Sequence, residues 1–176
     1  LTERLASTYN QLYLATAEAD RPALLRKMLE DPITDLRALA LRLIERKVLN
    51  AQAVSTEVRE KLRELIGDDQ PRIRAAAVAL LRDLDDEPAV DLALRHVLAE
   101  PDAAVQNAYL ALLSRQVKAE AVDPALVLLD RQPTRSAAAA TLRAALAAGV
   151  VADARRQRIA ERSLDLLREN PPDPAV

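Results

Sequence analysis

One apolar pattern recurs along the chain about every 32 residues, and this recurrence restricts the folds that are open to it. The three clearest copies read Leu36-Arg37-x2-Ala40-Leu41-x-Leu43-Ile44, Ile73-Arg74-x2-Ala77-Val78-x-Leu80-Leu81 and Val105-Gln106-x2-Tyr109-Leu110-x-Leu112-Leu113. A fainter copy begins at Ala137, and the four starting positions are 37, 32 and 32 residues apart. Periods of about 20 to 50 residues are typical of solenoids and other repeat arrays. The pattern therefore predicts a stack of two-helix units, with one copy in each unit.

Prolines mark the places where helices are expected to begin. Seven of the ten prolines precede an apolar run of helical period, and each has an acidic residue within three positions upstream: Pro22, Pro32, Pro71, Pro88, Pro101, Pro124 and Pro133. Proline has no amide hydrogen to leave unpaired in the first turn of a helix, and a nearby carboxylate can cap the free amides there. The 176 residues also include only two glycines and no Phe or Trp, so we predict an all-α chain.

Each repeated pattern is expected to form the second helix of its unit, here called the B helix. The first helix, the A helix, is predicted just upstream, over residues 22–30, 55–66, 88–99 and 124–131. Ser55 is expected to cap the second A helix, and Gly67 and Gly149 are expected to end helices in a left-handed conformation.

A further helix is expected at each end of the array, with an apolar stripe that packs on the repeats. The N-terminal stripe is Leu5, Tyr9 and Leu12, and the C-terminal stripe is Ile159, Ser163, Leu166 and Leu167. We predict one domain overall. Its parts are a capping helix in 1–20, four repeats over 21–150, a capping helix in 151–169 and a disordered tail or linker over 170–176.

The composition argues against catalytic and metal chemistry. There is no cysteine, the glycines are isolated, and the single histidine, His96, is predicted to lie on the solvated side of its helix. The net charge of −2 gives no overall attraction to nucleic acid or to a membrane surface, and no run of apolar residues is long enough for a membrane span. We expect a non-enzymatic, cytoplasmic protein without cofactor or metal. Because the chain begins with leucine rather than methionine, an upstream region could change this location.

Two arginines, Arg37 and Arg74, occupy the same position of the repeat, next to a buried residue. We predict that Arg37 pairs with Asp31 or Asp35 and that Arg74 pairs with Asp69, which would tie the turns together; the alternative is an anion-binding role. The acid pairs Asp68-Asp69 and Asp85-Asp86 are interpreted as exposed helix caps.

The B helices carry many basic residues and a ridge of apolar ones, whereas Tyr109 is interpreted as a core residue. The apolar ridge has two interpretations, either lateral packing between units or a shallow groove that receives a partner helix or an acidic peptide. For the second interpretation the predicted contact row is Arg42, Val78, Arg82, Leu110, Arg115 and Arg143.

The second repeat resembles a known family. Its pattern Asp69-x-Pro71-x-Ile73-Arg74-x2-Ala77-x2-Leu80-Leu81 resembles the B helix of HEAT-like repeats, especially the short variety of phycobilisome lyases and many bacterial scaffold proteins. The resemblance covers about residues 21 to 148. It implies a right-handed α-solenoid of about four HEAT-like helix pairs with capping helices, acting as the protein-interaction scaffold of a larger protein. Two alternatives stay open: a nucleic-acid-binding module that uses the B-helix arginines, and a lyase or glycosylase-type enzyme.

Overall fold

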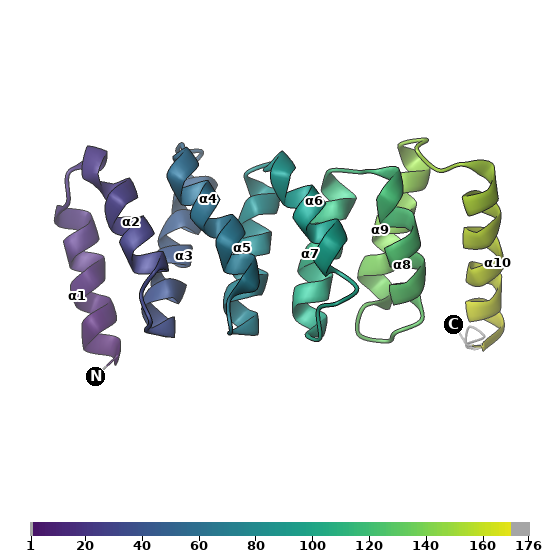
Figure 1. Cartoon of the computed structure of the whole chain (residues 1–176), viewed down its shortest axis with the longest axis horizontal. Helices are drawn as coiled ribbons and strands as arrows, with labels where there is room; N and C mark the ends of the chain where they lie inside the picture. The colour runs from purple at the N-terminus through teal and green to yellow at the C-terminus, as the bar shows by residue number, and fades with distance from the viewer. Residues whose placement is uncertain (1, 170–176) are drawn as a thin grey trace, which may run out of the picture.

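The computed structural model describes residues 2–169 and forms an elongated row of α-helices (Figure 1). Over that span it contains no β-strand, and none of its helices has the length and apolar character needed to cross a membrane. The chain advances along the long axis of the molecule from α1 at one end to α10 at the other. The tail predicted over residues 170–176 lies outside the described residues.

The helices form the pairs that the repeat predicted. The A helices are α2 (Arg21–Leu29), α4 (Thr56–Glu64), α6 (Glu87–His96) and α8 (Val122–Leu129). Their B partners are α3 (Thr34–Leu49), α5 (Pro71–Asp83), α7 (Ala103–Arg115) and α9 (Arg135–Ala147). Helices α1 (Thr2–Ala15) and α10 (Asp153–Glu169) flank them, and 3-10 turns lie at Glu18–Asp20, Leu65–Gly67 and Ala119–Ala121. The prediction of an all-α solenoid with four helix pairs is confirmed, whereas the hand of its superhelix stays a prediction.

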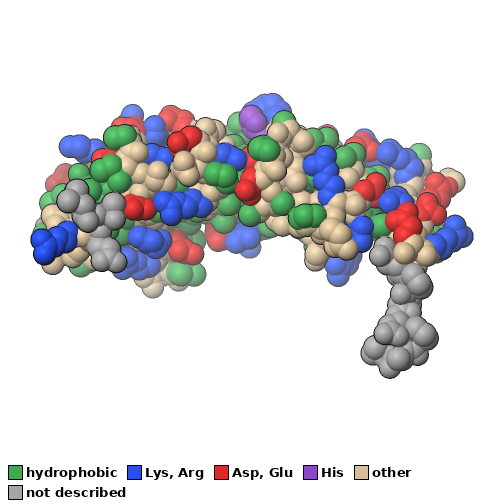
Figure 2. Space-filling model, turned by 90° about the horizontal axis from the view of Figure 1, so that it is seen from below, with side chains coloured by type: hydrophobic (Ala, Val, Ile, Leu, Met, Phe, Trp, Pro, Cys, Tyr) green, Lys and Arg blue, Asp and Glu red, His purple; other side chains and the backbone are tan. Residues whose placement is uncertain are grey.

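The helices of the B row are packed more closely against one another than those of the A row. Neighbouring B helices contact one another more extensively than neighbouring A helices do. A stack held together more closely along one row bends toward that row. In Figure 2 the edge opposite the purple histidine of α6 is hollowed near its middle, so the B helices line the inner side.

The core is a continuous seam of aliphatic side chains between the A and B rows. It includes Leu29, Ile44, Leu81 and Leu113, all fully buried. Each helix pair buries only one side in this seam and contacts its neighbours, so the stability of the fold accumulates along the stack.

The stripes of the flanking helices differ from those predicted. In α1 the side chain of Leu12 is 47% exposed, and Tyr13 is buried in its place. In α10 Ile159 is buried and Leu166 packs on the core, but Leu167 is 59% exposed. Each of these helices contacts the array on one side only, so a narrower stripe is covered than a repeat helix would bury.

The helix ends confirm some of the predicted caps and correct others. The Asp86 carboxylate accepts a hydrogen bond from the amide of Ala89, and it caps α6 while almost fully buried rather than exposed. Ser55 stands at the start of α4, but its hydroxyl makes no cap hydrogen bond. Gly149 has the expected positive φ of 72°, whereas Gly67 does not; the other left-handed residues of the described span are Ala51 (φ 53°) and Asp85 (φ 49°).

Two largely buried arginines join the first unit to the second and the second unit to the third. The guanidinium of Arg37 donates to Asp68 at 3.1 Å and to Asp69 at 2.9 Å, and Arg74 donates to both carboxylate oxygens of Glu100 at 2.6 and 3.0 Å. Each arginine also donates to carbonyl oxygens of the turn before its own helix. The prediction that these arginines tie the turns together is thus confirmed. The predicted partners, Asp31 or Asp35 for Arg37 and Asp69 for Arg74, are wrong, because each arginine pairs with carboxylates of the following unit. This series of arginines ends at α7, where Gln106 holds the same repeat position. Its side-chain amide donates to the carbonyl oxygens of Val97 and Glu100.

Candidate interaction surface

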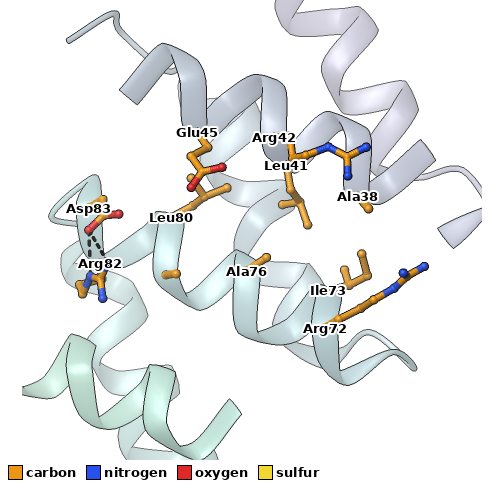
Figure 3. A pocket seen from close by; sticks show the side chains of 11 residues that line it. Ala38, Leu41, Arg42, Glu45, Arg72, Ile73, Ala76, Leu80, Arg82 and Asp83 are labelled. Carbon is orange, nitrogen blue, oxygen red and sulfur yellow. Dashed lines mark hydrogen bonds and ion pairs between the residues drawn. The ribbon is translucent and has the colours of Figure 1, made fainter. Parts of the chain in front are cut away.

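A groove runs between the neighbouring B helices α3 and α5, with a volume of about 340 Å³ (Figure 3). Its walls come from both helices: Ala38, Leu41, Arg42 and Glu45 of α3, and Arg72, Ile73, Ala76, Ala79, Leu80, Arg82 and Asp83 of α5. The volume lies within the usual range of ligand pockets, and the walls combine an apolar floor with charged side chains at the rim.

Small side chains open this groove. Ala38, Ala76 and Ala79 line it from the two helices and fill little of the space between them. The larger residues Leu41 and Leu80 also line it, but each is at most 5% exposed because its other side contacts the core. The groove therefore has a firm apolar floor that does not depend on a partner for its folding.

The charged side chains of the groove lie at opposite ends. Figure 3 shows the guanidinium groups of Arg42 and Arg72 on one side and the carboxylates of Glu45 and Asp83 on the other. Arg82, at the acidic end, donates to Asp83 at 2.8 Å.

Two of these charges have no partner within the described part of the chain. Arg42 and Glu45 are both exposed, and neither makes an ion pair or a side-chain hydrogen bond with a residue of 2–169. Arg72, in contrast, pairs with Asp35 at 2.9 Å. An exposed guanidinium without a partner keeps its donors free for a carboxylate from another molecule.

Comparison with known proteins places the fold in a family. The sequence model described as HEAT repeats matches residues 22–114, more than half of the chain, from α2 to the end of α7. The chain belongs to the HEAT-repeat family. HEAT repeats generally serve as scaffolds for protein interactions, and the matched region contains the whole α3–α5 groove. No curated protein matches the sequence significantly.

The HEAT-repeat structure separates the six residues of the predicted contact row. Arg42 and Arg82 line the same groove, but Val78 and Leu110 have no exposed surface. Their prediction as contact residues is wrong, because this position of the repeat lies between neighbouring B helices and is covered on both sides. For Val78 and Leu110 the lateral-packing interpretation is the correct one.

The remaining two residues of the row lie outside the groove. Arg115 of α7 forms a two-pronged ion pair with Asp85, at 2.6 and 3.1 Å, and this contact lowers the pKa of the Asp85 carboxyl. Arg143 of α9 is exposed, has no partner within residues 2–169, and lines a smaller hollow of about 180 Å³ between α8, α9 and α10. The exposed residues of the predicted row therefore lie in separate places instead of forming one continuous contact surface.

Many of the basic residues predicted for the B helices are neutralised within the HEAT array. Six of these cations lie against a carboxylate: Arg37, Arg72, Arg74, Arg82, Arg115 and Lys118. Because the paired acids cancel this charge locally, the inner side is not the continuous basic stripe that the sequence suggested.

The described residues contain no candidate metal site. His96 is exposed on α6, as predicted, and residues 2–169 contain no group of three or more His, Asp or Glu side chains placed to hold a metal ion. Tyr109 is 1% exposed, which confirms its place in the core, and burial raises its pKa to about 12.

Several groove residues were not predicted from the sequence as contact residues, namely Glu45, Ala76, Ala79, Leu80 and Asp83, whereas Arg72 was counted only among the basic residues of the B helices. One available signal was the first spacing of 37 residues, because it distinguishes the α3–α5 junction from the two junctions that follow. Another was the run of alanines at 75–77 and 79 on the second B helix, which predicts little side-chain volume between units.

Proposed function

We propose that this chain is a protein-interaction module whose α3–α5 groove receives the apolar side chains of a partner segment, with Arg42 contacting an acidic group of that segment. The observation that supports the proposal best is the unpaired Arg42 at the rim of an apolar groove. Grooves between helices bind amphipathic helices through apolar anchors, and rim charges select among partners.

The pairing of many B-face cations favours a protein partner over nucleic acid. Binding to a phosphate backbone draws on several free Lys or Arg side chains along one track, and six of the B-helix candidates here lie against carboxylates. A single free arginine beside an apolar floor suits a peptide better than a duplex.

The experiment selects peptides from a displayed random library on the purified chain and then measures their affinity by calorimetric titration. The test variant is Arg42→Glu. The matched control is Arg143→Glu, because Arg143 occupies the same position in its repeat, is also exposed and unpaired within residues 2–169, and lies outside the groove. We expect Arg42→Glu to weaken binding about tenfold and Arg143→Glu to change it by less than about twofold.

Two results would overturn the proposal. Selected peptides that bind both variants as tightly as the unchanged chain would show that the groove is not the binding surface. Tight, salt-sensitive binding of a short duplex DNA that Arg42→Glu abolishes would assign the free arginine to nucleic acid instead.

A further inference from the structure

We infer that the α3–α5 groove orients its occupant: the bound segment is an amphipathic helix with basic residues in its first turns and acidic residues in its last turns, lying antiparallel to α3 and α5. This inference rests on the proposed function and adds to it the charge order and direction of the partner. It is drawn from the charge distribution along the groove, not from the presence of the groove alone.

The charge order of the groove follows from six side chains. At one end Arg42 and Arg72, together with the Asp35 that pairs with Arg72, leave a formal charge of +1. At the other end Glu45, Asp83 and the Arg82 that pairs with Asp83 leave a formal charge of −1. The two ends are drawn apart in Figure 3, with the apolar residues between them.

This order is aligned with the helices that form the walls. Arg72 stands in the first turn of α5 and Asp83 is its last residue, while Arg42 precedes Glu45 by one turn in α3. An α-helix carries partial positive charge at its N-terminus and partial negative charge at its C-terminus. An occupant antiparallel to α5 therefore places its own negative end beside Arg42 and Arg72, and acidic side chains in its last turns strengthen the same contact.

Because Arg42 and Glu45 are unpaired, they are the two groove residues available to contact charges of opposite sign on the bound segment. Neither has a partner within residues 2–169, whereas Arg72, Arg82 and Asp83 already have one. A uniformly acidic segment would meet Glu45 and Asp83 with like charge, and a uniformly basic one would meet Arg42. Only a segment with both signs, in the right order, complements both ends.

The test uses three synthetic helical peptides, acetylated and amidated to remove their terminal charges, that share one Leu/Ala face. The first has lysines in its first two turns and glutamates in its last two, the second has glutamates throughout, and the third has lysines throughout. We expect the mixed peptide to bind about tenfold more tightly than either uniform one, with a preference that shrinks in high salt. The mixed peptide is expected to bind best although its charge order does not favour its own helix. Lysines near the N-terminus and glutamates near the C-terminus oppose the dipole of the peptide helix.

The direction is read with a nitroxide label on the glutamate end of the mixed peptide. In the unchanged chain the label should broaden the amide signals of Ala38 and Arg72 more than those of Glu45 and Asp83. The exchange variant Arg42→Glu with Glu45→Arg keeps the composition and net charge but reverses the order of the two unpaired charges. It should therefore lower the preference for the mixed peptide and move the broadening toward the other end of the groove. Both substituted residues are exposed, so the exchange is not expected to unfold the chain.

Each other outcome has a defined meaning. If none of the peptides binds, the proposed function fails together with the inference. If all three bind equally, or if the glutamate peptide binds best, the groove binds peptides without reading charge order, and only the inference is overturned. Concentration-dependent self-association that Arg42→Glu abolishes would make a second copy of the chain the occupant and would equally overturn it.

Discussion

The first and second junctions between B helices are tied together in the same way at their turns but differ along their faces. At each turn a buried arginine reaches a carboxylate of the next unit, Arg37 to Asp68 and Arg74 to Glu100. Along the faces, α5 and α7 make the most extensive helix contact of the described chain, whereas the groove lies between α3 and α5.

The comparison shows that joining consecutive units and filling the space between their B helices depend on different residues of the repeat. The polar contacts at the turns join consecutive units, because they are present at both junctions. The size of the side chains on the B helices then decides whether the space between units is filled or left open. Ala38, Ala76 and Ala79 leave it open at the first junction, and the fully buried Val78 and Leu110 belong to the closed part of the array.

The largest expected difference between the junctions comes from one substitution made at equivalent positions of two repeats. Leu110→Ala removes a fully buried side chain from the closed part and should lower the free energy of unfolding by about 4 kcal/mol. Leu41→Ala, beside the groove, should cost about 2 kcal/mol because water can enter the space that it vacates. Urea unfolding followed by circular dichroism measures both, and equal losses would contradict the distinction between a closed and an open junction.

The second prediction compares the two buried ion pairs. Glu100→Gln removes the carboxylate partner of Arg74 and should lower the free energy of unfolding by about 3 kcal/mol, since it leaves a nearly buried cation without its counter-charge. Asp68→Asn should cost less, because Arg37 keeps a second carboxylate, that of Asp69, whereas Arg74 keeps only carbonyl oxygens. The same urea titration ranks the two variants. A larger loss for Asp68→Asn would show that the first junction depends on its ion pair more than the second.

The third prediction concerns the end of α3. Ala51 has a positive φ of 53° directly after this helix, and there its Cβ is strained. Ala51→Gly should therefore raise the free energy of unfolding by about 1 kcal/mol. Asp85 has the matching conformation after α5, but its carboxylate pairs with Arg115, so Asp85→Gly should gain less. A thermal melt of both variants checks the order, and a lower melting temperature for Ala51→Gly would contradict it.

The smallest effect at neutral pH is predicted for Tyr109 of α7. Burial raises its pKa from 10.0 to about 12, so between these pH values the folded chain holds a proton that the unfolded chain has released. Stability from this group is complete below pH 10 and falls as the pH rises toward 12. Urea midpoints across that range should fall more steeply for the unchanged chain than for Tyr109→Phe, while parallel curves would show that the hydroxyl does not titrate in the core.

Much of the fold could be predicted from the sequence because its signals are local. Prolines, nearby acids and the spacing of apolar residues predicted the four helix pairs and the burial of Tyr109. The partners of Arg37 and Arg74 could not be predicted in this way, because the choice between an acid in the same turn and one about 30 residues later depends on how units stack.

The candidate site was predicted only in part, for a related reason. Helical periodicity placed Val78 and Leu110 away from the core seam, but it contains no information on whether a neighbouring helix covers that side. Arg42 and Arg82 were identified from their charge, whereas Glu45, Ala76 and Ala79 matter only once α3 and α5 lie side by side.

The most direct test of the account is the affinity of the mixed-charge peptide for a chain whose groove is filled by Ala76→Leu. Ala140→Leu is the control, because Ala140 holds the same repeat position on α9, is exposed and lies outside the groove. We predict that Ala76→Leu keeps the melting temperature of the unchanged chain and weakens binding at least about tenfold, while Ala140→Leu binds normally. Equal binding by the two variants would show that the space between α3 and α5 does not receive the partner.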